Sequence, residues 1–129
     1  MQVAPQEELD AFVRKYPDIK MLEVLMPDIN GIFRCKRIHH SEFQALCKGT
    51  LKAVASQPLV TTMGEYEDEV DPQLVAGEPD KKILPVAGSL APVPWLSSPT
   101  GQVVASLGEI DGGPAWVDPR NVLARELKR

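Results

Sequence analysis

The densest group of chemically reactive side chains in this sequence is an acidic run between Gly64 and Asp80. The run contains no lysine or arginine, and its carboxylates are Glu65, Glu67, Asp68, Glu69, Asp71, Glu78 and Asp80. Like charges without apolar spacing are typical of a solvated loop, because they cannot pack together. Clustered carboxylates also create a negative field, so the alternative is a loop that faces a protonated amine or a divalent metal bound elsewhere. The spacing does not match a calcium-binding loop.

Other motifs that would support chemistry are missing from the sequence. There is no glycine-rich phosphate loop, no metal-ligand spacing and no convincing nucleophile–base pair. His39 and His40 are adjacent, so they project in different directions and are interpreted as surface residues. Cys35 and Cys47 lack CxxC spacing, which favours reduced core residues over ligands or nucleophiles. We therefore predict no catalytic and no metal-ligating residue in this chain.

Length and composition limit the class of protein. A chain of 129 residues fits one domain with one core. A net charge of −4, with 25% charged and 43% hydrophobic residues, is ordinary for a soluble globular protein and argues against nucleic-acid binding. No apolar run approaches the ~20 residues that cross a bilayer, and the start of the chain does not resemble a secretory signal. We expect a cytoplasmic protein that contacts neither nucleic acid nor membrane.

A β-hairpin is predicted around Asp28–Ile38, with the sequence DINGIFRCKRI. Asn30-Gly31 is the dipeptide that best suits a two-residue type I′ turn between antiparallel strands. The strand before it, Ile19–Met26, is apolar on both of its faces, which predicts a central position in a sheet.

The strand after the turn alternates in character. Phe33 and Cys35 fall on one face, and Arg34 and Lys36 fall on the other. We expect the face of Phe33 and Cys35 to pack while the other face carries charge.

Three helices are predicted from apolar residues at helical spacing. The first follows Pro5, the second starts with a capping box of Ser41 and Gln44, and the third has Asp118 as its cap followed by Pro119. The respective apolar stripes are Leu9, Phe12, Val13 and Tyr16; Phe43, Leu46 and Cys47; and Val122, Leu123 and Leu127.

Further strands are predicted at 59–62, 83–85 and 102–110. The Asp111–Gly113 turn then leads to 115–117, so we expect a second hairpin that closes the sheet. Trp95 and Trp116 are interpreted as core or interface anchors.

Several short motifs, taken together and in order, carry a family resemblance. They are Asp28–Gly31, Arg34–Ile38, Gly77–Asp80, Leu84-Pro85, Pro94-Trp95, Asp118–Arg120 and Val122-Leu123. In this order and spacing they resemble the amino-terminal domain of the glutamine synthetase family over nearly the whole chain. The opening helix, which ends in Tyr16-Pro17-Asp18, makes the chain more similar to the γ-glutamylputrescine synthetase branch, which glutamylates polyamines, than to the ammonia-using enzymes.

This resemblance implies an α+β fold of the β-grasp type, in which a small mixed sheet packs on one or two helices. It implies that residues 1–118 form the amino-terminal domain. Residues 119–129 would then start a helix that leads to a catalytic domain absent from this chain.

The resemblance also implies a mechanism for a larger parent enzyme. Members of the family use ATP and Mg²⁺ or Mn²⁺ to turn the side-chain carboxylate of glutamate into an acyl phosphate, which ammonia or an amine attacks. The nucleotide, metal and glutamate ligands lie almost entirely in the catalytic domain, so this chain would bind no cofactor and be inactive alone.

In the assembled ring of the family, a loop of the amino-terminal domain helps to complete the amine site of the neighbouring subunit. By its order in the chain this loop is the acidic run, with Glu65, Glu67 and Asp68 as substrate-binding residues. Met63-Gly64 stands where relatives place an aspartate. The implied partners are the parent's catalytic domain and neighbouring subunits of a homo-oligomer.

A second interpretation stays open from the sequence alone. The chain could be an independent β-grasp module that binds partner proteins without doing chemistry. As a fragment of the full enzyme, by contrast, the chain would expose apolar interface, so we expect a tendency to self-associate.

Overall fold

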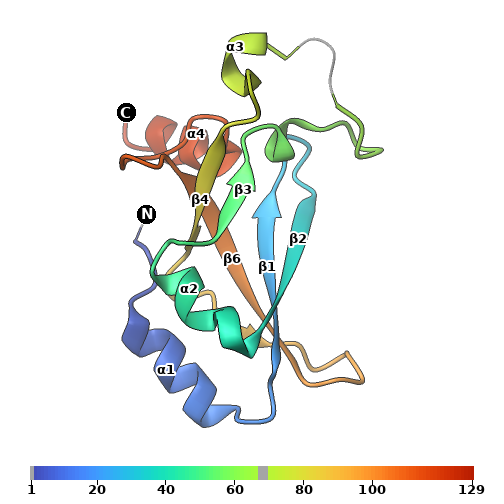
Figure 1. Cartoon of the computed structure of the whole chain (residues 1–129), viewed down its shortest axis with the longest axis vertical. Coiled ribbons are helices and arrows are strands. Elements are labelled where there is room, and N and C mark those ends of the chain that lie inside the picture. The colour runs from blue at the N-terminus through green and yellow to red at the C-terminus, as the bar shows by residue number, and fades with distance from the viewer. Residues whose placement is uncertain (1, 67–69) are drawn as a thin grey trace.

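The computed structural model describes residues 2–66 and 70–129 (Figure 1). The helices are α1 (Gln6–Lys15), α2 (Phe43–Cys47), α3 (Pro72–Val75) and α4 (Pro119–Glu126), with 3₁₀ turns η1 (His40–Glu42) and η2 (Gln57–Leu59). The strands are β1 (Met21–Pro27), β2 (Phe33–His39), β3 (Lys52–Val54), β4 (Asp80–Pro85), β5 (Ala91-Pro92) and β6 (Thr100–Gly108). The protein is an α+β domain with a curled mixed sheet packed against a few helices, as the sequence predicted. None of the helices in the described ranges is both long and apolar enough to cross a bilayer.

One mixed sheet of six strands organises the fold. Its order is β2-β1-β6-β4-β3, and the short β5 also pairs with β6. β1 is antiparallel to β2 and parallel to β6, whereas β6 is antiparallel to β4 and β5. The central position predicted for the first strand is confirmed, since β1 lies between β2 and β6. Figure 1 shows α1 and α2 near one end of the strands, with α3 and α4 at the other end.

The predicted hairpin is present, but its predicted two-residue turn is wrong. Pro27 pairs with Phe33, so the connection is five residues long rather than two. The Gly31 amide bonds to the Asp28 carbonyl at 3.0 Å, and Gly31 alone adopts a positive φ, at 77°. The buried Asp28 side chain also accepts backbone bonds from Asn30 and Ile32, which a tight type I′ turn could not supply.

The prediction for the two faces of β2 is also wrong. Ile38 is buried and pairs with Leu22, so the face of Arg34, Lys36 and Ile38 lies toward the core. Phe33 is 50% exposed, and Cys35, predicted as a core residue, is exposed as well. Because paired residues share a face, the apolar outer side of β2 is continuous with Leu25 and Pro27 of β1.

The core lies between the inner face of the sheet and the helices α1 and α2. Leu22, Val24, Val103 and Leu107 come from the sheet, and Leu9, Phe43 and Leu46 come from the helices. α1 packs closely because Gly101 of β6 has no side chain: a Cβ there would lie 2.9 Å from Phe12 Cζ. The first two predicted helices and their buried stripes are therefore confirmed, except that Val13 is exposed.

Several local predictions differ from the structure. The capping box does not form, because the Ser41 amide bonds to the His39 side chain and Ser41 lies inside η1. The predicted strand at 59–62 is wrong: η2 occupies its start, and only Val60 makes a single bridge, to Tyr66. The second hairpin is shorter than predicted: the chain turns back antiparallel at the bridge of Gly108 with Pro114, but residues 115–117 form no strand. The strands at 83–85 and 102–110 are confirmed as β4 and β6.

Candidate functional site

The hairpin turn forms a rigid anchor around the carboxylate of Asp28. This side chain has 0% exposure and accepts backbone bonds from Asn30 at 2.9 Å and from Ile32 at 3.0 Å. Its other oxygen, Oδ2, accepts from Arg34 Nε at 2.9 Å and lies 2.8 Å from Arg34 Nη2. A buried carboxylate is stable only when its acceptor sites are filled, and here they are.

These contacts set the ionisation of Asp28. Burial raises the pKa of the carboxyl, but the hydrogen bonds from Ile32, Arg34 and Asn30 outweigh burial and hold the pKa below its ordinary value. The positive charge of Arg34 acts in the same direction. Asp28 is therefore an anion at neutral pH, and Arg34 is fixed in position by it.

The same turn holds the start of the acidic run. Arg34 Nη2 donates to the Thr61 carbonyl at 3.1 Å, and Asn30 Nδ2 donates to the Val60 carbonyl at 2.8 Å. The Ile29 amide bonds to the carbonyl of Pro58 in η2 at 2.9 Å. We call these contacts of Asn30 and Arg34 with Val60 and Thr61 the turn clamp. It links residues about thirty positions apart in sequence.

Beyond the turn clamp, residues 61–66 make a small loop that faces solvent. The Thr61 amide bonds to the Glu65 carbonyl at 2.8 Å, and the Glu65 amide bonds to Thr61 Oγ1 at 3.2 Å. Glu65 is exposed, so its carboxylate is presented outward from a backbone that is tied back to the hairpin. Glu67 and Asp68, the other two predicted site residues, lie outside the described residues.

The far end of the acidic run is held against the same region. Ser56 Oγ donates to Glu78 Oε2 at 2.6 Å, and the Ala55 amide bonds to the Pro79 carbonyl at 3.0 Å. Glu78 has a φ of 47°, which is uncommon for a residue with a side chain and stores strain. The two ends of the acidic run are therefore both held close to η2.

The chemistry available here is electrostatic recognition. No group of three or more His, Cys, Asp or Glu residues able to hold a metal occurs in the described ranges. An exposed carboxylate on a fixed backbone can instead attract a cation brought by another chain or by a substrate.

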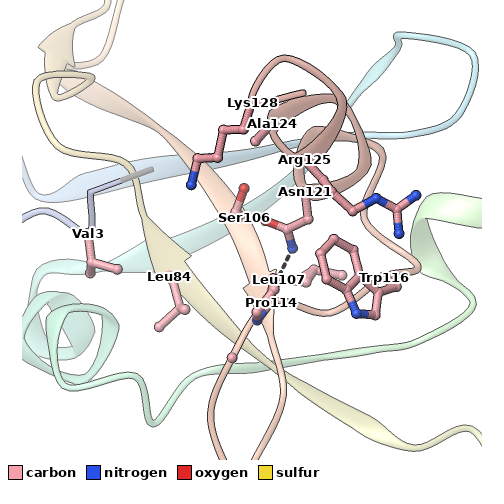
Figure 2. Close-up of a pocket in the computed structure, with 11 residues that line it drawn as sticks. Val3, Leu84, Ser106, Leu107, Pro114, Trp116, Asn121, Ala124, Arg125 and Lys128 are labelled. Atoms are coloured by element: carbon pink, nitrogen blue, oxygen red, sulfur yellow. Dashed lines mark hydrogen bonds between the residues drawn. The ribbon is translucent and has the colours of Figure 1, made fainter.

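A second site lies between α4 and the sheet, on the side shown in Figure 2. This cavity has a volume of about 480 Å³, and we call it the α4 cavity. Leu84, Leu107 and Pro114 supply apolar surface, and Trp116, Arg125 and Lys128 lie around them (Figure 2).

α4 begins where the sequence predicted, with the Asp118 side chain accepting from the Arg120 amide at 2.9 Å. The side of α4 that faces the protein differs from the prediction, which placed the leucines there. Asn121, Ala124, Arg125 and Lys128 line the cavity, whereas Leu123 and Leu127 are 59% and 78% exposed.

Two polar bonds to β6 explain this orientation. Asp118 Oδ2 accepts from the Leu107 amide at 2.7 Å, and Asn121 Nδ2 donates to the carbonyls of Leu107 at 2.7 Å and Ala115 at 2.9 Å. β1 pairs with β6 only as far as Val104, so Asp118 and Asn121 satisfy the backbone of Leu107 beyond that pairing. Burying Asn121 turns the leucines outward.

Comparison with known proteins gives the relationship. No protein-family model matches the sequence. The γ-glutamylputrescine synthetase PuuA of Escherichia coli (strain K12) is 36% identical over 119 residues, which cover 92% of this chain and 25% of that protein. The chain is homologous to this glutamine synthetase-type ligase.

Solved structures give the same fold. A novel glutamine synthase homologue aligns with a TM-score of 0.70 and 21% identity, over 86% of this chain and 26% of its own. GmaS in complex with ADP aligns with a TM-score of 0.67 and 20% identity, over 94% of this chain and 25% of the GmaS chain. The fold matches the amino-terminal glutamine synthetase domain, and the chain spans about a quarter of the length of these relatives.

The motifs that carried the resemblance have structural roles in this domain. Asp28 fixes Arg34, which belongs to the turn clamp, and Glu78 holds the end of the acidic run against Ser56. The sequence identified these residues as motifs but not as the supports of one loop. An Asp two residues before Asn30 was the available signal, since Asp side chains often bond the backbone two positions on.

Neither Asn121 nor the α4 cavity was found from the sequence. Asn121 lies inside a helical pattern, where its buried bonds depend on the backbone of a strand from another part of the chain. Trp116 was predicted as a core or interface anchor and is 49% exposed beside the cavity, and Trp95 is also exposed, so neither is a core residue. His39 and His40 are exposed, as predicted.

Proposed function

We propose that this chain is the amino-terminal domain of an ATP-dependent ligase that joins glutamate to ammonia or to an amine. The observation that carries the proposal is the 36% identity to γ-glutamylputrescine synthetase over 92% of the chain. In this proposal residues 1–118 form the domain and α4 leads into a catalytic domain. The parent assembles as a homo-oligomer in the cytoplasm.

The acidic run completes the amine site of a neighbouring subunit, through Glu65, Glu67 and Asp68. The support is geometric. Glu65 is exposed on a loop whose backbone is fixed by the turn clamp, which is what a carboxylate needs in order to meet a cation on another subunit. A carboxylate close to an ammonium group favours its charged form and holds it in place.

ATP and a divalent metal supply the activation of glutamate in such a ligase. No cluster of three or more potential metal ligands occurs among the described residues, and the N-terminus of α4 is capped by the carboxylate of Asp118, which would repel phosphate there. We therefore assign no catalytic step to this chain. Its part is to bind and orient the amine, and the chain alone is inactive.

The test is an ADP-release assay on the protein encoded by the complete reading frame. Glutamate, ATP and Mg²⁺ are supplied with ammonia, putrescine or other amines in turn. With the preferred amine, Glu65→Gln should raise the KM for the amine about tenfold, because a charge-assisted hydrogen bond contributes roughly 1.5–3 kcal/mol. The KM for glutamate should not change.

Glu42→Gln is the matched control, since Glu42 is also exposed but lies in η1, away from the acidic run. This variant should leave both KM values unchanged. A folded full-length protein that turns over none of the amines would overturn the ligase proposal and favour a stand-alone β-grasp interaction module. Normal amine KM in Glu65→Gln and in matched variants of Glu67 and Asp68 would overturn the site assignment alone.

A further inference from the structure

The α4 cavity has the size and lining of a small-molecule site. Its volume of about 480 Å³ lies within the range of roughly 300–1,000 Å³ that is usual for ligand pockets. Leu84, Leu107 and Pro114 provide an apolar floor. Small residues keep it open, because Gly113 and Ala124 line it where larger side chains would fill it.

One wall of the cavity is a rigid aromatic surface. Trp116 is 49% exposed, and the guanidinium of Arg125 lies 4.9 Å from its ring centroid. This cation–π contact orients the indole, so its free area is available for stacking. Arg125 also pairs with Glu126 at 3.0 Å, which offsets its charge.

The rim of the cavity carries a positive charge that is not offset. Lys128 lines the cavity one helical turn beyond Ala124, and no ion pair joins it to a residue in the described ranges. Figure 2 shows its side chain extended toward the side of the cavity formed by Val3 and Leu84. In a chain with a net charge of −4, a lysine beside an apolar floor is a local exception that favours an anion.

We propose that the α4 cavity binds a small amphipathic monoanion, with an aromatic or aliphatic body on the apolar floor and a carboxylate or sulfonate beside Lys128. The indole of Trp116 stacks on the body of the ligand. This site is separate from the acidic run and does not depend on the ligase proposal.

The experiment uses the probe 8-anilinonaphthalene-1-sulfonate and the fluorescence of Trp116. In a Trp95→Phe background Trp116 is the remaining tryptophan, and Trp95 does not line the cavity. Energy transfer from Trp116 to the probe should saturate at one probe per chain, with a Kd on the order of 10–100 µM for such an open site. Displacement by 4-phenylbutyrate, but not by 4-phenylbutylamine, should follow, because the two differ in the charge of the head group.

Variants then locate the site on α4. Lys128→Gln should weaken binding about threefold to fivefold, the range of a partly exposed ion pair. Arg129→Gln changes the net charge equally and does not line the cavity, so its Kd should stay within about twofold of the parent value. Ala124→Phe should fill the cavity and abolish binding, whereas Leu123→Phe, on the exposed face, should not.

Equal displacement by the amine and the acid would overturn the assignment of an anion. Unchanged binding in Ala124→Phe, in a variant shown to be folded by circular dichroism, would place the probe on the exposed leucines of α4 and overturn the site. If Lys128→Gln and Arg129→Gln weakened binding to the same degree, the probe would be attracted by net charge alone. That result would also overturn the assignment of the site.

Discussion

At the scale of single residues, Asp28 and Arg34 determine how the hairpin turn works. Both are charged, and the side chain of Asp28 is fully buried, so its contacts with Arg34 replace part of the hydration that it loses on burial. Arg34 serves two partners at once, Asp28 and the Thr61 carbonyl, because its planar guanidinium presents several donors in a fixed geometry. Arg34 therefore links the β1–β2 hairpin to the segment that leads into the acidic run.

Asp28→Asn should lower the free energy of unfolding by about 2–4 kcal/mol at neutral pH, since it leaves Arg34 without its charge partner. The folded pKa of Asp28 is lowered, so its contribution is complete above the unfolded value of about 3.9 and is lost as the pH falls through the folded pKa. Urea unfolding at several pH values should show the gap between parent and variant closing below about pH 4. Glu23→Gln, at a partly exposed pair with Arg37 on the outer face of the sheet, should cost less than about 1 kcal/mol. A loss equal to that of Asp28→Asn would contradict the special role of Asp28.

Arg34→Lys should release the start of the acidic run while keeping the charge beside Asp28. A lysine lacks the planar guanidinium that donates to Asp28 and to the Thr61 carbonyl at the same time. The backbone amides of Gly64 and Glu65 should therefore exchange with solvent about tenfold faster. Arg37→Lys, on the outer face of the same strand, should leave these amides unchanged. Exchange that stays slow in Arg34→Lys, measured by NMR, would show that the turn clamp does not hold the loop.

At the scale of elements, α4 is held by polar bonds rather than by an apolar stripe. Asn121→Ala should cost about 1–2 kcal/mol, because it removes the two buried hydrogen bonds that Asn121 Nδ2 donates to the carbonyls of Leu107 and Ala115. Leu127→Ala removes a larger apolar group from the same helix and should change stability by less than about 0.5 kcal/mol, since Leu127 is largely exposed. Chemical denaturation measures the free energy of unfolding of both variants. A larger loss of stability in Leu127→Ala than in Asn121→Ala would contradict the orientation described for α4.

The elements that the sequence predicted well are those whose signals are local. Helical spacing located α1 and α2, a run that is apolar on both faces located β1, and strand-forming residues located β6. Asp118 with Pro119 located the start of α4. The failures have non-local causes. The strand expected at 59–62 is replaced by η2 because that backbone bonds to the hairpin turn, and the outward Phe33 follows from the pairing of Ile38 with Leu22.

The candidate site was predictable only in part, for the same reason. Charge density alone marked the acidic run in the sequence. The supports of the run, from Arg34 at one end to Ser56 at the other, come from distant segments, and their hydrogen bonds depend on the folded chain. The orientation of α4 and the cavity beneath it depend on the backbone of Leu107 in the same way.

At the scale of the whole molecule, the exposed apolar residues of the described ranges include some on the sheet and some on α4. Phe33 lies on the outer side of the sheet, and Leu123 and Leu127 lie on the outer side of α4. A chain that spans about a quarter of the length of its relatives would expose such surface if other parts of the proposed parent normally cover it. The isolated chain should consequently self-associate.

Sedimentation velocity between about 1 and 100 µM, a range in which weak protein association becomes visible, should show a sedimentation coefficient that rises with concentration. Leu123→Glu combined with Leu127→Glu should reduce this rise, because two like charges would replace the two exposed leucines. Met63→Glu is the control, since Met63 is exposed just before the acidic run and lies on neither of these two surfaces. An unsubstituted chain that stays monomeric at the highest concentration would show that the expectation of self-association is wrong.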